Sequence, residues 1–264
     1  MARTFQRVFF LFVAAGLSVS GAHAKKGGHF FARDDEARGN VRPASTGWSP
    51  SYDDHLRRNI PRDMFNLPPS SVGRACPNYA QMSKADRAAF IVHFFKSMAW
   101  AESDFVPTTR YAERGSNFVD KYVTIKKSSG RKGRTKTVRV PIYKKDSVTG
   151  LDIVSEGLMQ VSYQDAEKHG CSFDWKADRK LGVKDSRKTI FDPKRNIQCA
   201  INIVAKQLGK GRELVSQGNK YYFACLDTTG GNHSKFMNSM RAFKPCFSPD
   251  PSGKPKSIQK RRRS

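Results

Sequence analysis

The strongest constraint on the fold is the stretch 83–107, which reads SKADRAAFIVHFFKSMAWAESDFVP. Ser83, followed three residues later by Asp86, is typical of a helix start, because a serine hydroxyl can cap the first free backbone amides. Apolar residues then recur at helical spacing, namely Ile91, Phe94, Phe95 and Met98. The pattern predicts a helix with one face in a hydrophobic core.

Glu102 lies on the core-facing side of this predicted helix, near its end. At 100° per residue it stands about 20° from Ile91 and about 20° from Phe95 around the helix axis. Loss of water there would raise the pKa of the carboxyl group and keep it protonated near neutral pH, as a general acid requires. A glutamate at a frayed helix end would instead face solvent or pair with an arginine, and the helix taken alone favours that second interpretation.

The first 24 residues have the features of a secretory signal peptide. Arg3 and Arg7 precede the apolar run 8–17, and Ala22-His23-Ala24 matches a cleavage site. No other run reaches the roughly 18 apolar residues of a membrane span, so we expect an exported protein, periplasmic or secreted, without one. The net charge of +25 attracts anionic polymers such as cell wall, lipid head groups, nucleic acid or acidic glycans.

The five cysteines predict disulfides rather than a metal site. None is spaced as C-x-x-C, and no histidine lies where a zinc site would need one, so we expect no metal and no cofactor. We expect the pairs Cys171–Cys199 and Cys76–Cys246, which leaves Cys225 as a free thiol buried in a helix.

Composition divides the chain into four parts. Residues 1–24 are the signal peptide, 25–73 an extended or disordered leader, 74–247 the compact domain, and 248–264 a basic tail. Within the domain, alternating strands at 122–125 and 137–143 predict a basic β-hairpin insertion at 119–147. It carries ten Lys and Arg and no acid between residues 121 and 145, and either grips an anionic polymer or is a solvated arm. With helices starting near Ser162, Asp192 and Phe236, the fold class is α+β, mainly α.

Four segments, in this order along the chain, resemble the lytic transglycosylase (SLT domain) and goose-type lysozyme-like superfamily. They are Ala101-Glu-Ser-Asp-Phe105, Gly157-Leu-Met-Gln160, the Asn196-Ile197 pair on the helix after Asp192-Pro193, and the Tyr-rich stretch 221–226. The resemblance covers roughly residues 85–245 and implies a lysozyme-like fold with a basic hairpin insertion. It also implies an exported muramidase that cleaves the β-1,4 bond between MurNAc and GlcN(Ac) in peptidoglycan, with Glu102 as general acid.

The same resemblance implies a set of substrate-binding residues in the groove beside Glu102. Asn196 could instead brace a neighbouring loop, and Met159 could be plain core. The aromatic stretch reads Tyr221-Tyr-Phe-Ala-Cys-Leu226 where many family members have Tyr-Asn-Ala-Gly, so Tyr221 competes with Tyr222 as hydrogen-bond partner of Glu102. The set is Ser103, Gly157, Met159, Gln160, Asn196 and Tyr222.

A second carboxylate decides between two chemistries. An inverting lysozyme needs an Asp or Glu that activates water on the far side of the sugar, whereas a lytic transglycosylase closes a 1,6-anhydro ring with the substrate's own hydroxyl. Glu156, just before Gly157, is the best-placed catalytic base and Asp152 the next; either could be a surface acid that balances nearby lysines. Hydrolysis or transglycosylation, acetylated or de-N-acetylated glycan, and own or foreign wall stay open.

The sequence is also compatible with two other functions. One is a peptidase that uses Cys225 with His233, and the other is a non-catalytic basic protein that binds cell wall or nucleic acid through the hairpin and the tail. For the muramidase we expect peptidoglycan glycan strands as the partner, no specific nucleic acid, and a monomer.

Overall fold

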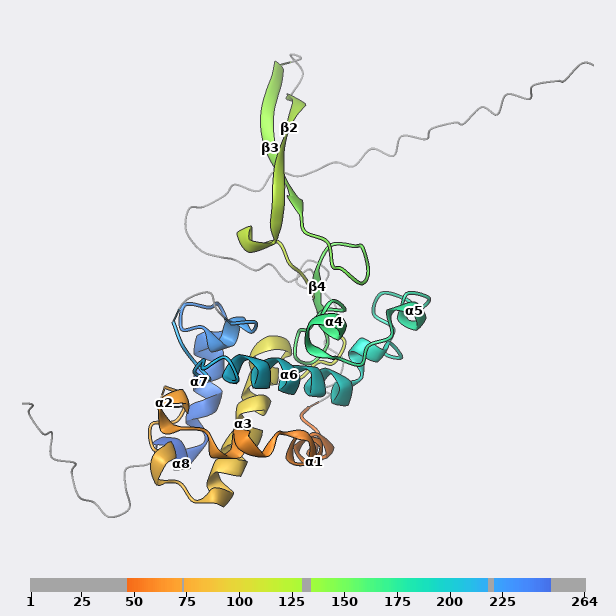
Figure 1. Cartoon of the computed structure of the whole chain (residues 1–264). Coiled ribbons are helices and arrows are strands. Elements are labelled where there is room, and N and C mark those ends of the chain that lie inside the picture. The colour runs from red at the N-terminus through yellow and green to blue at the C-terminus, as the bar shows by residue number, and fades with distance from the viewer. Residues whose placement is uncertain (1–46, 73, 130–133, 218–220, 248–264) are drawn as a thin grey trace, which may run out of the picture. The chain divides into compact units, whose positions relative to one another are not determined.

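A computed structural model describes residues 47–72, 74–129, 134–217 and 221–247 (Figure 1). The expected signal peptide, the basic tail and residues 25–46 of the expected leader lie outside these ranges. In the described part, helices predominate over two small antiparallel sheets of two strands each, which confirms the mainly α, α+β class. No helix of this part is long and apolar enough to cross a membrane.

The elements follow one another in a simple order. The helices are α1 (Pro50–Asn59), α2 (Pro69–Val72), α3 (Lys84–Ser103), α4 (Asp165–His169), α5 (Trp175–Asp178), α6 (Pro193–Leu208), α7 (His233–Arg241) and α8 (Lys244–Phe247). The 3-10 turns are η1 (Arg62–Asn66), η2 (Tyr79–Gln81), η3 (Ser116–Phe118), η4 (Thr189–Phe191) and η5 (Ala224–Leu226). The strands are β1 (Arg110–Ala112), β2 (Val119–Ser129), β3 (Arg134–Tyr143) and β4 (Val154–Glu156).

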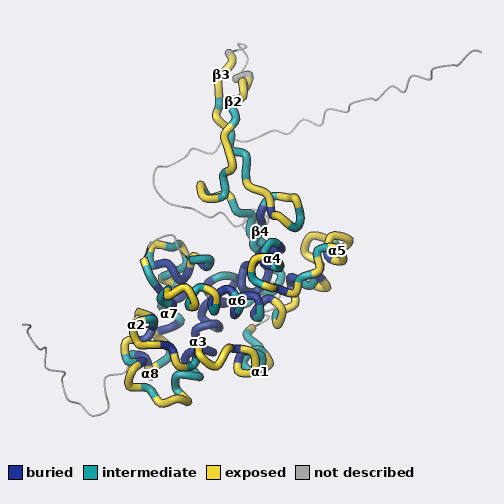
Figure 2. Tube along the Cα trace, in the orientation of Figure 1, coloured by how far each residue is buried: buried dark blue, intermediate teal, exposed yellow. Residues whose placement is uncertain are grey.

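Helix α3 begins where the sequence predicts and is buried along most of its length (Figure 2). Ser83 caps it, because its Oγ accepts a hydrogen bond from the Asp86 backbone amide at 3.1 Å. Helix α7 packs against it, with the rings of Phe94 and Phe236 in edge contact at 5.6 Å. The helix ends at Asp104, whose φ of 54° is left-handed, and this sharp stop places Glu102 at the end of a rigid element.

The folded domain begins earlier than the sequence indicated. Residues 50–72, expected within an extended leader, form α1, η1 and α2. They supply buried core side chains from each of these elements and their junctions, namely Leu56, Ile60, Met64, Leu67 and Val72. These apolar positions are divided among short elements, so no single helical period runs long enough to be recognised in the sequence.

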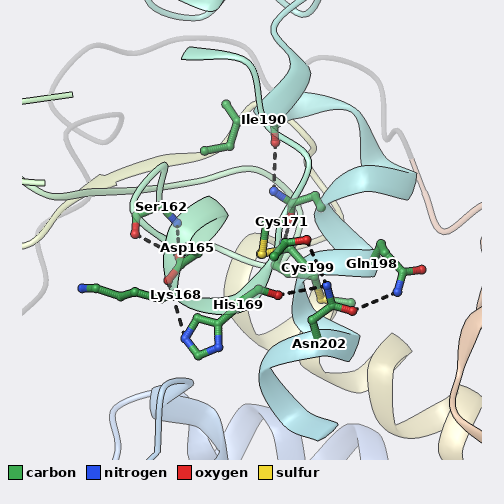
Figure 3. The surroundings of a disulfide bond; sticks show 12 residues. Ser162, Asp165, Lys168, His169, Cys171, Ile190, Gln198, Cys199 and Asn202 are labelled. Atoms are coloured by element: carbon green, nitrogen blue, oxygen red, sulfur yellow. Dashed lines mark hydrogen bonds and ion pairs between the residues drawn. A yellow bond between two sulfur atoms is a disulfide. The ribbon is translucent and has the colours of Figure 1, made fainter. Parts of the chain in front are cut away.

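Both expected disulfides are present. Cys76 is bonded to Cys246 and Cys171 to Cys199, while Cys225 is a free and buried thiol, in the 3-10 turn η5 rather than a helix. Figure 3 shows the second bridge, which ties the segment after α4 to α6. The two bridges are compatible with an exported protein.

Two β-ribbons complete the fold. Strands β2 and β3 pair antiparallel from Val119↔Tyr143 to Ser129↔Arg134, which confirms the basic hairpin. Strands β1 and β4 form a shorter antiparallel ribbon in which Tyr111 lies opposite Ser155. Strand β1 follows α3 closely in the chain, and its pairing with β4 positions the candidate site.

Candidate active site

Glu102 has the surroundings of a carboxyl group held in its protonated form. Its Oε1 is shielded from solvent and has no hydrogen-bond partner among the described residues. Burial raises the pKa of this carboxyl, and the negative charge of Glu113 raises it further; hydrogen bonds to the thiol and backbone of Cys225 act in the opposite direction. Glu102 therefore keeps its proton to higher pH than an exposed glutamate, as expected from the core-facing helix position.

Glu113 is a second carboxylate in this site, which the sequence analysis missed. It follows β1 directly, and its backbone amide donates to Ile153 O at 3.0 Å. Its Oε1 accepts a hydrogen bond from Ser155 Oγ at 2.5 Å. Burial raises the pKa of Glu113, and the Ser155 hydrogen bond lowers it. The structure thus places Glu113 close enough to Glu102 for its negative charge to raise the pKa of Glu102.

Glu156, expected as the catalytic base, is directed elsewhere. Successive strand residues point to opposite faces, so Glu156 and Ser155 of β4 lie on different sides of the ribbon. Its buried Oε1 accepts a hydrogen bond from Arg110 Nε at 2.5 Å, on the neighbouring strand. The pKa of Glu156 is raised by burial and lowered by Arg110 and Lys188. Glu156 is therefore the partner of an ion pair on the opposite face from Ser155 and Glu113.

Asp152, the second candidate base, belongs to a surface ion cluster. Its two carboxylate oxygens lie 2.7 Å from Arg114 Nη1 and 2.6 Å from Lys145 Nζ. Hydrogen bonds from Lys145 and Arg114 hold its pKa below the ordinary value. A carboxylate with two cationic partners is a weak proton acceptor, so the alternative in which Asp152 balances surface charge describes it best.

The Gly157–Gln160 segment is held against α6 by a buried asparagine. Gly157 has a φ of +85°, and a Cβ placed there would lie 2.2 Å from Asn196 Nδ2 and 2.7 Å from Ile190 O. Asn196 is fully buried; its Oδ1 accepts from the Met159 amide at 2.5 Å, and its Nδ2 donates to Glu156 O and Ile190 O. Asn196 thus has the bracing role that the sequence analysis weighed against substrate binding.

Three more residues expected to bind substrate are engaged within the protein. The Ser103 hydroxyl shares its single hydrogen between Ala99 O at 3.0 Å and Leu158 O at 2.8 Å, which joins the end of α3 to the same segment. Gln160 Nε2 donates to Gly157 O at 2.7 Å and to Thr109 O at 3.1 Å. The Met159 side chain is fully buried in the core. These contacts shape the wall beside Glu102 without presenting the Ser103 hydroxyl or the Met159 side chain to solvent.

Tyr222, expected to hydrogen-bond near Glu102, instead donates its hydroxyl to Asp165. The same Asp165 carboxylate accepts the Ser162 amide at 2.7 Å, as Figure 3 shows. The rival Tyr221 donates to Glu213 O at 2.5 Å. The hydroxyl groups of Tyr221 and Tyr222 therefore have hydrogen-bond partners other than Glu102.

Cys225 takes the place next to Glu102 that was expected for a tyrosine. Burial raises the pKa of its thiol well above the ordinary value, and the neighbouring charge of Glu102 adds to this effect. His233 approaches the backbone oxygen of Cys225 through Nδ1, at 3.0 Å. A thiol held in its protonated form is a poor nucleophile, which argues against the Cys225–His233 peptidase.

An exposed aromatic side chain and a lysine stand beside the acid. Trp100, on α3, is 38% exposed. Lys235 Nζ lies 4.7 Å from the centre of the Trp100 ring and 2.6 Å from Asp104 Oδ1, and its charge lowers the pKa of Glu102. Exposed aromatic faces are surfaces on which sugar rings can pack. The described residues contain no cluster of His, Cys, Asp and Glu suited to a metal ion.

The fold and the site together define a mainly helical α+β domain with two partly buried glutamates, one at the end of its central helix and one just after strand β1. No known protein-family model and no curated protein matches the chain. Solved structures of Bd0314 DslA, a Bdellovibrio protein, are similar to it. The wild-type form has a TM-score of 0.51 and 18% identity, over 74% of this chain and 91% of that chain. A glutamate-to-glutamine mutant has a TM-score of 0.51 and 17% identity, with the same coverage. At such identities the likeness is one of fold alone.

Proposed function

We propose that the protein is an exported muramidase of lysozyme-like fold, which cleaves the β-1,4 glycosidic bond between MurNAc and GlcN(Ac) in peptidoglycan. Glu102 acts as the general acid and Glu113 as the second carboxylate. The observation that carries the proposal is the pair itself, since Glu102 and Glu113 are both partly buried, burial raises the pKa of both, and the charge of Glu113 raises the pKa of Glu102 further.

Different surroundings give the two carboxyl groups different roles. Glu102 has a shielded oxygen without a partner, which favours the neutral acid that protonates a glycosidic oxygen. Glu113 accepts a hydrogen bond from Ser155, which favours its ionised form. An ionised Glu113 can take a proton from an attacking water, so the proposal is hydrolysis rather than closure of a 1,6-anhydro ring. Glu113 thus replaces Glu156 in the role of base.

Two further observations support this assignment, the first for Glu102 as the acid and the second for the pair. The sequence motifs around Glu102, Gly157 and Asn196 resemble those of the lytic transglycosylase and goose-type lysozyme-like superfamily. Two of the DslA structures each carry one glutamate-to-glutamine substitution, at positions 11 residues apart in that chain. Glu102 and Glu113 have the same separation, 113 − 102 = 11.

The charge of the chain suits the proposed substrate. Ordinary peptidoglycan is anionic, and a net charge of +25 favours its capture at low ionic strength. De-N-acetylated glycan carries ammonium groups, which this charge repels at long range. A mechanism that depends on the substrate acetamide would fail on such glycan, whereas one with Glu113 as its own base would not.

The test is clearance of cell-wall suspensions by the Glu102→Gln variant. Glutamine keeps the size of the side chain but cannot donate the proton, so we expect a loss of roughly a hundredfold or more. The matched control is Glu167→Gln, because Glu167 is an exposed glutamate on α4. If the Glu102→Gln protein clears walls as fast as the wild type, Glu102 is not the general acid and the proposal is wrong.

A further inference from the structure

The basic hairpin has one face whose central part is apolar. In an antiparallel pair, residues directly opposite each other project to the same side. The pairs Val123↔Val140 and Ile125↔Val138 therefore share a face, to which Ile142 also belongs because it is two residues beyond Val140. We call these five residues the apolar hairpin face.

This face is not covered by the core of the domain. None of the five residues belongs to the hydrophobic core or to the partly buried side chains packed against it in the described part of the chain. Ile125 is 37% exposed, and the other four are half-buried. Aliphatic side chains at consecutive positions of one sheet face form a contiguous patch, and such exposed patches mark interaction surfaces.

Lysines stand at both ends of the same face. Lys121 lies opposite Ile142 at the base of the hairpin, and Lys127 lies opposite Lys136 toward its tip. All three are exposed, and within the described ranges none of them has an ion-pair partner. Long lysine stems can lie along apolar surface while the ammonium group reaches outward.

The opposite face of the hairpin is mostly polar beyond the Tyr122↔Pro141 pair near its base. Thr124 lies opposite Arg139, and Lys126 lies opposite Thr137. The Arg139 guanidinium lies 4.2 Å from the centre of the Tyr122 ring, so this cation is engaged with an aromatic side chain of its own face. The hairpin is therefore amphipathic, with its aliphatic residues on one side only.

The chemistry of the apolar hairpin face selects its partner. A second copy of the chain would bring together two segments that each carry ten Lys and Arg without an acid between residues 121 and 145. A polyanion in solution would engage the lysines but leave the valine and isoleucine side chains in water. An anionic lipid surface meets both needs, because aliphatic groups enter the acyl boundary while lysines reach the phosphates.

We propose that the apolar hairpin face, formed by Val123, Ile125, Val138, Val140 and Ile142 and flanked by Lys121, Lys127 and Lys136, docks on the surface of an anionic lipid membrane. Each lysine near such a surface strengthens binding roughly fivefold. The aliphatic residues add a contribution that salt does not screen. The docking is independent of the cleavage reaction proposed for Glu102 and Glu113.

The first test is co-sedimentation of the full chain with vesicles of phosphatidylcholine alone or with added phosphatidylglycerol. We compare Ile125→Ser/Val138→Ser, a cross-strand pair of the apolar hairpin face, with Thr124→Ser/Thr137→Ser on the polar face. Both double variants replace β-branched side chains in the same strands, so any loss of strand propensity is matched. Circular dichroism and thermal unfolding check that each variant is folded.

The wild type should bind the phosphatidylglycerol vesicles strongly and the phosphatidylcholine vesicles weakly. The apolar-face variant should lose about tenfold or more in partitioning, because the two substitutions remove aliphatic surface from the lipid contact, and the polar-face control should stay within about twofold. Equal binding by the two double variants would overturn the proposal, as would a wild type that binds duplex DNA but not anionic vesicles.

The second test measures directly whether the apolar hairpin face enters the bilayer interface. Ile125→Trp and Thr124→Trp place a fluorophore on opposite faces at neighbouring positions. With brominated phosphatidylglycerol vesicles, the first variant should show added quenching over the wild-type background and the second should not. Equal quenching of the two variants, or none in either, would mean that this face does not enter the bilayer interface.

Discussion

Replacement of Glu113 by glutamine removes the proposed base with little change in shape. Glutamine keeps an oxygen that can accept the Ser155 hydroxyl, so the 2.5 Å contact has a substitute. What is lost is the negative charge and the ability to take a proton from water. The fold should therefore persist, while hydrolysis should fall.

The expected magnitude follows from the roles assigned to the pair. General base catalysis contributes roughly 10²–10⁴ in rate, or about 2.7–5.4 kcal/mol at 1.36 kcal/mol for each factor of ten. A second effect concerns Glu102, whose pKa is raised in part by the charge of Glu113. Without that charge the pKa of Glu102 falls, so the basic limb of the residual pH–rate profile should move to lower pH.

The assay is the rate of release of soluble fragments from purified peptidoglycan across a pH series, with Glu167→Gln as control. In the wild type, the acidic limb of kcat/KM reports ionisation of Glu113 and the basic limb reports ionisation of Glu102. A Glu113→Gln protein with activity within tenfold of the wild type, or with an unmoved basic limb, would refute the pairing of these two carboxyl groups.

Three further outcomes are expected from single substitutions. Ser155→Ala removes the hydrogen bond that lowers the pKa of Glu113, so the acidic limb of the pH–rate profile should move to higher pH; an unmoved limb would separate Ser155 from Glu113. Gly157→Ala should destabilise the domain by at least about 3 kcal/mol in chemical denaturation, because left-handed strain adds to a clash with Asn196. Its control is Gly150→Ala, which has a φ of +69° and open space, and should cost only about 1–2 kcal/mol. Glu102→Gln should flatten the dependence of stability on pH. Because the pKa of Glu102 is raised in the folded state, its stabilising contribution is present below the ordinary value of 4.5 and is lost as pH rises through the folded-state value. The variant should therefore equal or exceed the wild type in unfolding free energy at neutral pH, and a variant that is less stable there would contradict the burial of this carboxyl.

Local patterns in the sequence predicted the elements that depend on local chemistry. The Ser83 cap and the apolar stripe gave the course of α3 and placed Glu102 on its core-facing side. Alternation and a loop gave the basic hairpin, and Asp192 with Pro193 gave the start of α6. The disulfide pairs were also predicted. In each case the deciding residues lie close together in the chain or belong to a small set of cysteines.

The second carboxylate could not be predicted in this way. Glu113 follows a strand of three residues, and only pairing with β4, more than forty positions later, sets it beside Ser155. The same pairing places Glu156 on the other face, where it forms an ion pair with Arg110. One residue of register in a short ribbon thus decides which glutamate joins Glu102.

The contact of Cys225 with Glu102 also depends on tertiary structure. The sequence predicted Tyr222 or Tyr221 as the partner of Glu102 and Cys225 in a helix, whereas Cys225 lies in the 3-10 turn η5 and its thiol contacts Glu102. Tyr222 instead donates a hydrogen bond to Asp165, a buried carboxylate that also accepts a hydrogen bond from the Ser162 amide. Turn geometry and a distant acceptor, neither of which has a strong sequence pattern, set the outcome.

The most direct test of the glutamate pair is mass spectrometry of the muropeptides released by the wild-type protein in heavy-oxygen water. Hydrolysis with Glu113 as base predicts reducing ends that carry one heavy oxygen, and their loss in both Glu102→Gln and Glu113→Gln. Products with 1,6-anhydro ends, which contain no solvent oxygen, would contradict the role given to Glu113, and the absence of glycan cleavage would contradict the proposed function itself.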